Sequence, residues 1–215
     1  MATANQCSAE PRFVLYGVPW QVYLALRTLP ENEHVRMTYD RGALEMMRPS
    51  KRHEQFAVMV ELLIHAWAEE GSIDILGCRT MTCRREDLDR GFEPDNCYYV
   101  AHEAEMRSKD DLDLRHDPPP DLAIEIDIST SSLEKLELYE AFGVPEVWRY
   151  DGDSLHVCRL DARRHYAVHS SSLVFPGFPI ADAERLLRET GVASQTALVK
   201  SFRQSIGGQG GRTSE

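Results

Sequence analysis

The sequence lacks most of the signals that mark a secreted, zinc-binding or membrane-embedded protein. Its five cysteines are odd in number and none forms the C-x-x-C spacing of a zinc or redox site, so we expect free thiols in a reducing cytoplasm. The longest apolar stretch, residues 56–68, is interrupted by Glu61 and His65 and is too short to cross a bilayer. There is no Walker-type phosphate loop, G-x-S-x-G nucleophile elbow or internal repeat. These absences predict a cytoplasmic protein with no membrane partner.

Basic residues are also in short supply. The chain has 24 Lys and Arg against 35 Asp and Glu, a formal net charge of −11. Because nucleic-acid affinity comes largely from basic groups that contact phosphates, any nucleic-acid surface has to be local. The best candidates are basic residues ahead of Pro94, which are Arg79, Arg84, Arg85 and Arg90, together with Lys51 and Arg52. An ordinary solvated loop explains the same stretch equally well.

The length and the apolar content predict one domain. The chain has 215 residues, of which 42% are hydrophobic, and this is enough for a substantial core. We expect a single domain over residues 12–204, with disordered tails at 1–11 and 205–215, because the C-terminal tail is rich in Gly and Ser.

Apolar spacing and turn residues predict the order of the elements in the first half of the chain. We expect a helix within 13–29 that stops at Pro30, and then a β-hairpin of two edge strands, 35–39 and 43–47, around Gly42. The longest helix should cover 51–70.

The second half should alternate between strands and helices. The sequence predicts a helix that begins at a capping box of Ser131 and Glu134 and stops at Gly143. It also predicts a helical region at 181–204, a polar loop at 101–120, and strands at 73–82, 95–100, 121–129, 146–150, 155–160 and 166–169.

The strand at 121–129 carries the clearest functional signal, because its residues alternate strictly between two faces. One face carries Leu122, Ile124, Ile126 and Ile128, and the other carries Asp121, Ala123, Glu125, Asp127 and Ser129. The Cα atoms of Glu125 and Asp127 should lie roughly 6.6 Å apart at about 3.3 Å per residue, so that both carboxylates can reach one divalent ion.

Hydrolysis of a phosphodiester needs a hard cation held by carboxylate oxygens, and three acids are placed to provide them. Asp95, which follows Pro94 at a strand start, and Glu125 form the natural ligand pair for Mg²⁺ or Mn²⁺. Asp127 is either a third ligand or a partner for an arginine. Lys135, in the first turn of the next helix, can stabilise developing negative charge. The structural alternatives are a backbone-binding aspartate at position 95 and a solvated lysine at position 135.

Two other polar residues, His53 and Glu54, begin the long helix. Glu54 complements the positive N-terminal end of that helix, and a histidine there is often simply exposed. We therefore interpret both as structural residues.

Six segments together resemble the Uma2 family of restriction-endonuclease-like proteins, within the PD-(D/E)xK nuclease superfamily. They lie at 37–45, 53–54, 84–88, 93–99, 119–127 and 143–151, within a similarity that runs from about Trp20 to Phe202. The resemblance implies an α/β fold with a restriction-endonuclease-like core, in which helices flank a mixed central sheet, preceded by an N-terminal helix and β-hairpin. It also implies Mg²⁺-dependent cleavage of DNA, with Asp95 as the first acid and Glu125 as the second. The same resemblance suggests that the start of the long helix, at His53 and Glu54, approaches the site.

Two positions depart from the superfamily pattern. Lys135 matches a lysine that has moved to the following helix, and Asp127 stands where the pattern has lysine. We therefore predict a homodimeric, metal-dependent DNA endonuclease with Asp95, Glu125 and Lys135 as catalytic residues. The alternatives are an inactive binding module with a nuclease fold, and a hydrolase of RNA or of a small phosphoester.

Overall fold

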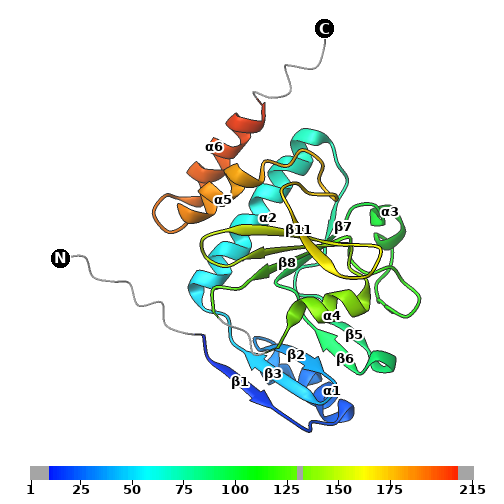
Figure 1. The fold of residues 1–215 in the computed structure, drawn as a ribbon. Coiled ribbons are helices and arrows are strands. Elements are labelled where there is room, and N and C mark those ends of the chain that lie inside the picture. Colours follow the sequence, from blue (N-terminus) through cyan, green and yellow to red (C-terminus); the bar gives the residue numbers. More distant parts are fainter. Residues whose placement is uncertain (1–9, 130–132, 208–215) are drawn as a thin grey trace, which may run out of the picture.

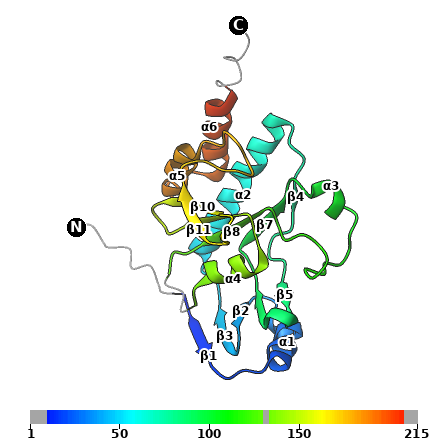
Figure 2. The same cartoon turned by 45° about the vertical axis from the view of Figure 1, so that its right-hand side comes forward.

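A computed structural model describes residues 10–129 and 133–207, which form two β-sheets and the helices packed on them (Figures 1 and 2). The strands are β1 (Arg12–Leu15), β2 (Arg36–Asp40), β3 (Ala43–Met47), β4 (Leu76–Gly77), β5 (Cys83–Arg85), β6 (Arg90–Phe92), β7 (Asn96–Tyr99), β8 (Leu122–Ile126), β9 (Glu146–Tyr150), β10 (Leu155–Leu160) and β11 (Tyr166–His169). The helices are α1 (Trp20–Thr28), α2 (Lys51–Gly71), α3 (Glu103–Met106), α4 (Lys135–Phe142), α5 (Ile180–Arg188) and α6 (Gln195–Gly207), with 3₁₀ turns η1 (Pro30–Asn32) and η2 (Glu86–Leu88).

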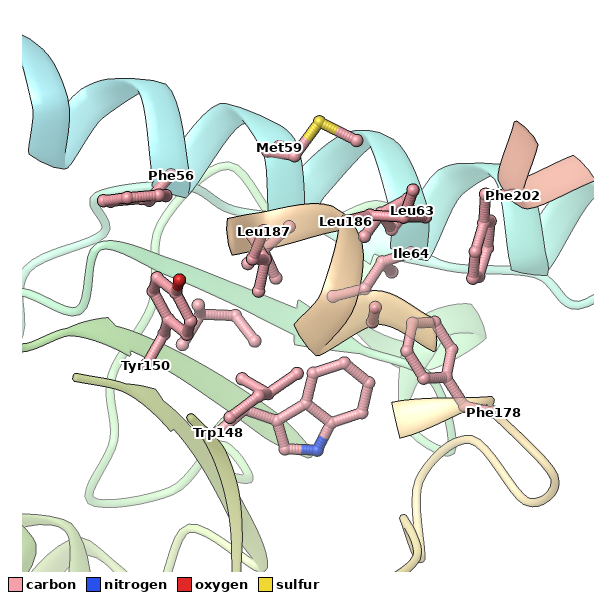
Figure 3. Close-up of a cluster of buried hydrophobic side chains, with 14 of the residues drawn as sticks. Phe56, Met59, Leu63, Ile64, Trp148, Tyr150, Phe178, Leu186, Leu187 and Phe202 are labelled. Carbon is pink, nitrogen blue, oxygen red and sulfur yellow. The ribbon is translucent and has the colours of Figure 1, made fainter. Parts of the chain in front are cut away.

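The larger sheet has six strands in the order β11-β10-β9-β8-β7-β4. It is mixed, because β8 and β9 run parallel while the other neighbours are antiparallel. Helices α2, α5 and α6 cover one face of this sheet, where the apolar side chains of β8 meet Phe56, Leu63 and Trp148 (Figure 3). The apolar spacing of α2 therefore builds the main core.

The opposite face of β8 is covered by α4, which lies between the two sheets (Figure 1). Ala123 of β8 shares this second cluster with Leu138 and Tyr139 of α4 and with Phe92 of β6. The predicted two-face alternation of β8 is thus confirmed. Every residue of the strand is buried, since both faces are covered.

The smaller sheet has five antiparallel strands in the order β1-β3-β2-β6-β5, and α1 packs on it through Tyr23. The predicted hairpin is present, and its turn uses left-handed φ angles of 47° at Arg41 and 90° at Gly42. Our placement of both strands at an edge is wrong. β3 lies between β1 and β2, because residues 12–15 also pair with it. β2 lies between β3 and β6, because the chain returns to this sheet after α2.

Three expected elements differ in the structure. The helix predicted within 13–29 is confined to Trp20–Thr28, because Arg12–Leu15 alternates in burial and pairs with β3 as β1. The strand predicted at 73–82 shrinks to the two residues of β4, since the backbone takes a φ of 41° at Arg79. The region 181–204 contains two helices, which are separated near Gly191 at a φ of 90°.

Two further differences concern the ends of elements. The loop predicted at 101–120 contains the single turn of α3. Helix α4 ends at Gly143 as expected, but its N-cap is Glu134, without a side-chain cap, and the expected cap Ser131 lies outside the described residues. Residues 205–207 continue α6, while 1–9 and 208–215 are not described.

The chain passes from the smaller sheet to the larger one through residues 93–95, between β6 and β7. Glu93 is bound on the small-sheet side, where its carboxylate accepts hydrogen bonds from the Met37 N–H and from Arg27, both at 3.1 Å. Asp95 is bound on the large-sheet side, where its carboxylate accepts a hydrogen bond of 2.8 Å from the Ile126 N–H. These two acids therefore tie the crossing segment to opposite sheets.

Replacing Gly91 with alanine should lower the free energy of unfolding by about 1–3 kcal/mol, since the core around it is already filled. A Cβ at this position would lie within 2.9 Å of the hydroxyl oxygen and two ring carbons of Tyr23. Urea denaturation measures the loss. Gly207→Ala is the matched control, because its Cβ would meet no atom within 4 Å, and an equal loss in both variants would contradict the packing explanation.

Candidate active site

The site is centred on Glu125, which the buried strand β8 holds with only 2% of its surface exposed. Its two carboxylate oxygens accept hydrogen bonds from the Lys135 ammonium and the Tyr139 hydroxyl, which project from successive turns of α4. Burial raises the pKa of Glu125 to about 7, although the charge of Lys135 opposes this shift. Burial acts to lower the pKa of Lys135, but Glu125, Asp127 and Asp95 outweigh it and keep the amine charged.

Asp95 lies beside this pair, at the start of β7. Its backbone N–H donates to the Ile124 carbonyl at 3.1 Å, and its carboxylate accepts from the Ile126 N–H. The two bonding partners, Ile124 and Ile126, flank Glu125 in β8, so these bonds hold Asp95 beside Glu125. Burial acts to raise the pKa of Asp95, but the contact with His53 and the charge of Lys135 outweigh it and lower the pKa. The pKa values of these two neighbouring acids therefore shift in opposite directions.

His53 has a larger part in the site than the sequence suggested. It is fully buried in the first turn of α2, with Nε2 2.9 Å from Asp95 and Nδ1 3.1 Å from Glu10, both ion-pair contacts. Burial acts to lower the pKa of His53, but the two carboxylates outweigh it and raise the pKa to about 9. Our interpretation of His53 as an ordinary helix-start residue misses this contact. The signal available was its place in the His-Glu segment of the family resemblance.

Asp127 follows the end of β8 and contacts two cations. Its carboxylate accepts a hydrogen bond of 2.8 Å from Arg149 of β9, and its other oxygen lies 3.9 Å from the Lys135 ammonium. Of the two roles left open by the sequence, the arginine partnership is the one seen in the structure. That Asp127 also acts as a third metal ligand stays a prediction.

A polar network from the N-terminal segment closes one side of the site. The Arg12 guanidinium donates to Glu45 at 2.7 Å and to the Ser129 hydroxyl at 3.0 Å. The Ser129 hydroxyl in turn donates to Glu10 at 2.7 Å. Glu10, Arg12 and Tyr139 are site residues that we did not predict, because nothing in their local sequence distinguishes them from ordinary surface or core residues.

The donor set is suited to a magnesium ion. Asp95 and Glu125 supply carboxylate oxygens, and Mg²⁺ is usually bound through one or two carboxylates, several waters and substrate phosphates. Within residues 10–129 and 133–207, no three His, Cys, Asp or Glu side chains are grouped so that they could hold one metal ion. Asp95 and Glu125 are therefore the residues whose oxygens would hold such an ion.

Two hollows reach this centre. A small one is bordered by Asp95, Lys135, Arg12 and Arg36, and an open one of about 460 Å³ is bordered by Asp127, Lys135 and Arg149. Lys135 borders both, and it therefore lies between the buried acids and the open surface.

The arginines that we considered for a nucleic-acid surface are largely occupied. Arg79 pairs with Glu61, Arg85 with Asp87 and Arg90 with Asp40. Their positive charge is therefore balanced locally, which leaves Arg84, Lys51 and Arg52 of the residues that we considered.

Other expectations concern the thiols and the membrane. Cys78, Cys83, Cys97 and Cys158 are free thiols, as predicted, while Cys7 lies outside the described residues. No helix in the described part of the chain is both long and apolar enough to cross a membrane.

The pKa shifts of Glu10 and His53 predict how stability depends on pH. Burial acts to raise the pKa of Glu10, but contacts with His53, Ser129 and Ser50 lower it from 4.5 to about 2. Its stabilising contribution is therefore present above pH 4.5 and is lost as the pH falls through about 2. The raised pKa of His53 has the opposite sign, so its contribution is complete below pH 6.5 and is lost as the pH rises through about 9.

Stability should therefore be highest between about pH 4.5 and 6.5. Urea denaturation of wild type and Glu10→Gln from pH 3 to pH 10 checks this, and the difference between them should shrink as the pH falls below 4.5. Glu33→Gln is the control, because Glu33 is exposed. Its free energy of unfolding should differ little from that of wild type at every pH. A Glu10→Gln difference that grows toward low pH would contradict the assignment.

The fold is an α/β nuclease-type fold shared with a solved protein. The crystal structure of a "putative nuclease belonging to DUF820" from Anabaena variabilis matches with a TM-score of 0.51 and 17% identity, over 86% of this chain and 99% of that one. The predicted fold class, a mixed sheet flanked by helices, is confirmed by this match. The model of the Uma2 family, described as "Putative restriction endonuclease", matches residues 20–189, and this chain belongs to that family. No curated protein matches the sequence.

Proposed function

We propose that this protein is a Mg²⁺-dependent nuclease that hydrolyses phosphodiester bonds in DNA. The observation that carries the proposal is the meeting of Asp95, Glu125 and Lys135 at one end of β8, although they come from three separate segments. Family membership supports nuclease function in general. Metal dependence, DNA as the substrate and a place in the PD-(D/E)xK superfamily are parts of the proposal, and a homodimer stays a prediction.

Asp95 and Glu125 would hold the ion, with Mn²⁺ as an alternative to Mg²⁺. When bound, the ion would neutralise phosphate charge and supply a hydroxide nucleophile near neutral pH. Coordination needs Glu125 in its ionised form, and Lys135 favours that form by its charge. Tyr139 fixes the orientation of the Glu125 carboxylate through its hydroxyl.

Lys135 has a second role toward the substrate. Its ammonium remains charged because Glu125, Asp127 and Asp95 surround it, and it borders the open hollow. A phosphate entering from that hollow would meet this charge, which stabilises the negative charge that develops on the phosphoryl oxygens. Arg149 holds Asp127 on the other side, so that Asp127 lies 3.9 Å from the amine.

Cleavage assays with supercoiled and single-stranded DNA test the proposal at low salt, with Mg²⁺, Mn²⁺ or EDTA. Wild type should nick DNA only with the divalent ion, and Lys135→Met should lose about 10²–10³-fold in rate. Lys200→Met is the matched control, because Lys200 is exposed on α6. Activity that persists in EDTA, or that is equal in wild type and Lys135→Met, would overturn the proposal. Cleavage of RNA alone would favour the ribonuclease alternative, and binding without cleavage would favour the inactive module.

A further inference from the structure

A third hollow, of about 410 Å³, adjoins the candidate active site. It is formed by residues before and within β2, the connection from β3 to α2, the first turn of α2 and residues before β5, which are Glu33, His34, Arg36, Arg48, Pro49, Glu54, Arg79 and Thr80. No Phe, Tyr or Trp side chain borders it, so it offers charge rather than a stacking surface.

Arg36 connects this hollow to the catalytic centre, because it also borders the small hollow beside Asp95 and Lys135. Its guanidinium lies 3.9 Å from Asp95 and 3.9 Å from Glu54, both longer than a hydrogen bond. The side chain is 17% exposed, and its buried Nε has no hydrogen-bond partner among the described residues. Such a donor is costly to leave unpaired.

Arg48 adds an accessible charge to the same hollow. It is exposed, and within the described residues it forms no ion pair. Lys51 and Arg52 follow it, so residues 48–52 contain three basic side chains and no acidic one. Lys51 and Arg52 occupy the first turn of α2, whose N-terminus carries a partial positive charge. In a chain of net charge −11, this is a local concentration of positive charge.

The start of α2 lies beside the candidate site. His53, one residue after Arg52, contacts Asp95, and this contact fixes the start of α2 against the catalytic carboxylates. Lys135 and Arg36 border the same small hollow, and Arg36 and Arg48 border the next one, so a DNA strand whose scissile phosphate lies at Lys135 would place neighbouring phosphates along Arg36 and Arg48.

We infer that this hollow binds the phosphates that flank the scissile one in a DNA strand, with Arg36 and Arg48 as its contacts. The inference rests on the proposed function and adds the path of the substrate. The lining offers guanidinium groups suited to phosphate oxygens, which outnumber its two carboxylates, Glu33 and Glu54. Contacts to phosphates carry no sequence information, so binding should be independent of base sequence.

Fluorescence anisotropy with labelled DNA tests the inference, in EDTA so that binding is measured without cleavage. Arg48→Ala should weaken binding about tenfold at low salt, as expected for one lost charge-assisted hydrogen bond. The slope of log K against log salt should fall by about 0.9 for duplex or 0.7 for single strands. Two unrelated sequences should give the same affinity. Arg163→Ala, an exposed arginine in the β10–β11 connection, is the matched control.

The outcomes separate the inference from the proposed function. Weaker binding in Arg48→Ala but not in Arg163→Ala supports the inference, even if no cleavage is found. Equal binding in all three proteins, undetectable binding by wild type, or binding of RNA in place of DNA overturns it. A wild type that cleaves DNA while Arg48→Ala binds normally would leave the nuclease proposal intact. Because Arg48 is exposed, circular dichroism should show an unchanged fold in this variant.

Discussion

Glu125→Gln should lose about 10²–10³-fold or more in metal-dependent cleavage, the largest effect that we expect on activity. Glutamine keeps the size of the side chain and an oxygen that accepts from Tyr139, but it removes the charge that holds a divalent ion and pairs with Lys135. Initial rates of plasmid nicking with Mg²⁺ or Mn²⁺ measure this loss. Thermal unfolding of the same protein shows whether the fold survives.

Glu137→Gln provides the comparison for that experiment, because Glu137 is exposed on α4 near the same site. It should cleave at the wild-type rate. If Glu125→Gln retained full activity, the observed nicking would have to come from another site or another protein. If both variants lost activity together, the effect would be a general disturbance of α4 rather than loss of a ligand.

His53→Ala should have the largest effect on stability, a loss of about 3–5 kcal/mol in the free energy of unfolding. The imidazolium of His53 joins the carboxylates of Glu10 and Asp95, and all three side chains are buried. Alanine leaves two buried carboxylates without the cation between them. Removal of one partner costs far more than the net contribution of an intact pair, because the remaining charges cannot return to water.

Urea denaturation of His53→Ala and of His65→Ala measures this effect. His65 lies on the same helix but is exposed, so its replacement should change stability by only about 0.5 kcal/mol. Equal stability of the two variants would mean that the carboxylates find other partners. The loss should also be greater at pH 6 than at pH 10, because the pKa of His53 is raised to about 9 and wild type has lost the charge there.

Local patterns were sufficient for one half of the site. The alternation of 121–129 placed Glu125 on the face of β8 opposite Ile124 and Ile126, and the structure covers that face with α4. The capping-box and Gly143 signals placed Lys135 in the first turn of the predicted helix, and α4 begins at that residue. The expectation that it meets Glu125, which the structure shows, came only from the family resemblance. The two placements depend on residues only ten apart in the chain.

Contacts between distant residues account for what the sequence did not predict. Glu10 meets His53, and His53 meets Asp95, across separations that no periodicity encodes. The smaller sheet was hard to foresee for a related reason. Its strands β5 and β6 have three residues each, too few to show alternation, and β6 pairs with β2 of a hairpin more than forty residues earlier.

The crossing segment 93–95 makes the alignment of the two sheets part of the geometry of the candidate site. Glu93 is tied to the small sheet and Asp95 to the large one, with Pro94 as the single residue between them. A rotation of one sheet against the other would leave Asp95 beside Glu125, because both are held on the large sheet, but it would change how far Arg36 of β2 stands from Asp95. Substitutions far from the candidate site, such as those around Tyr23 in the smaller sheet, would therefore change the small hollow beside Asp95 and Lys135.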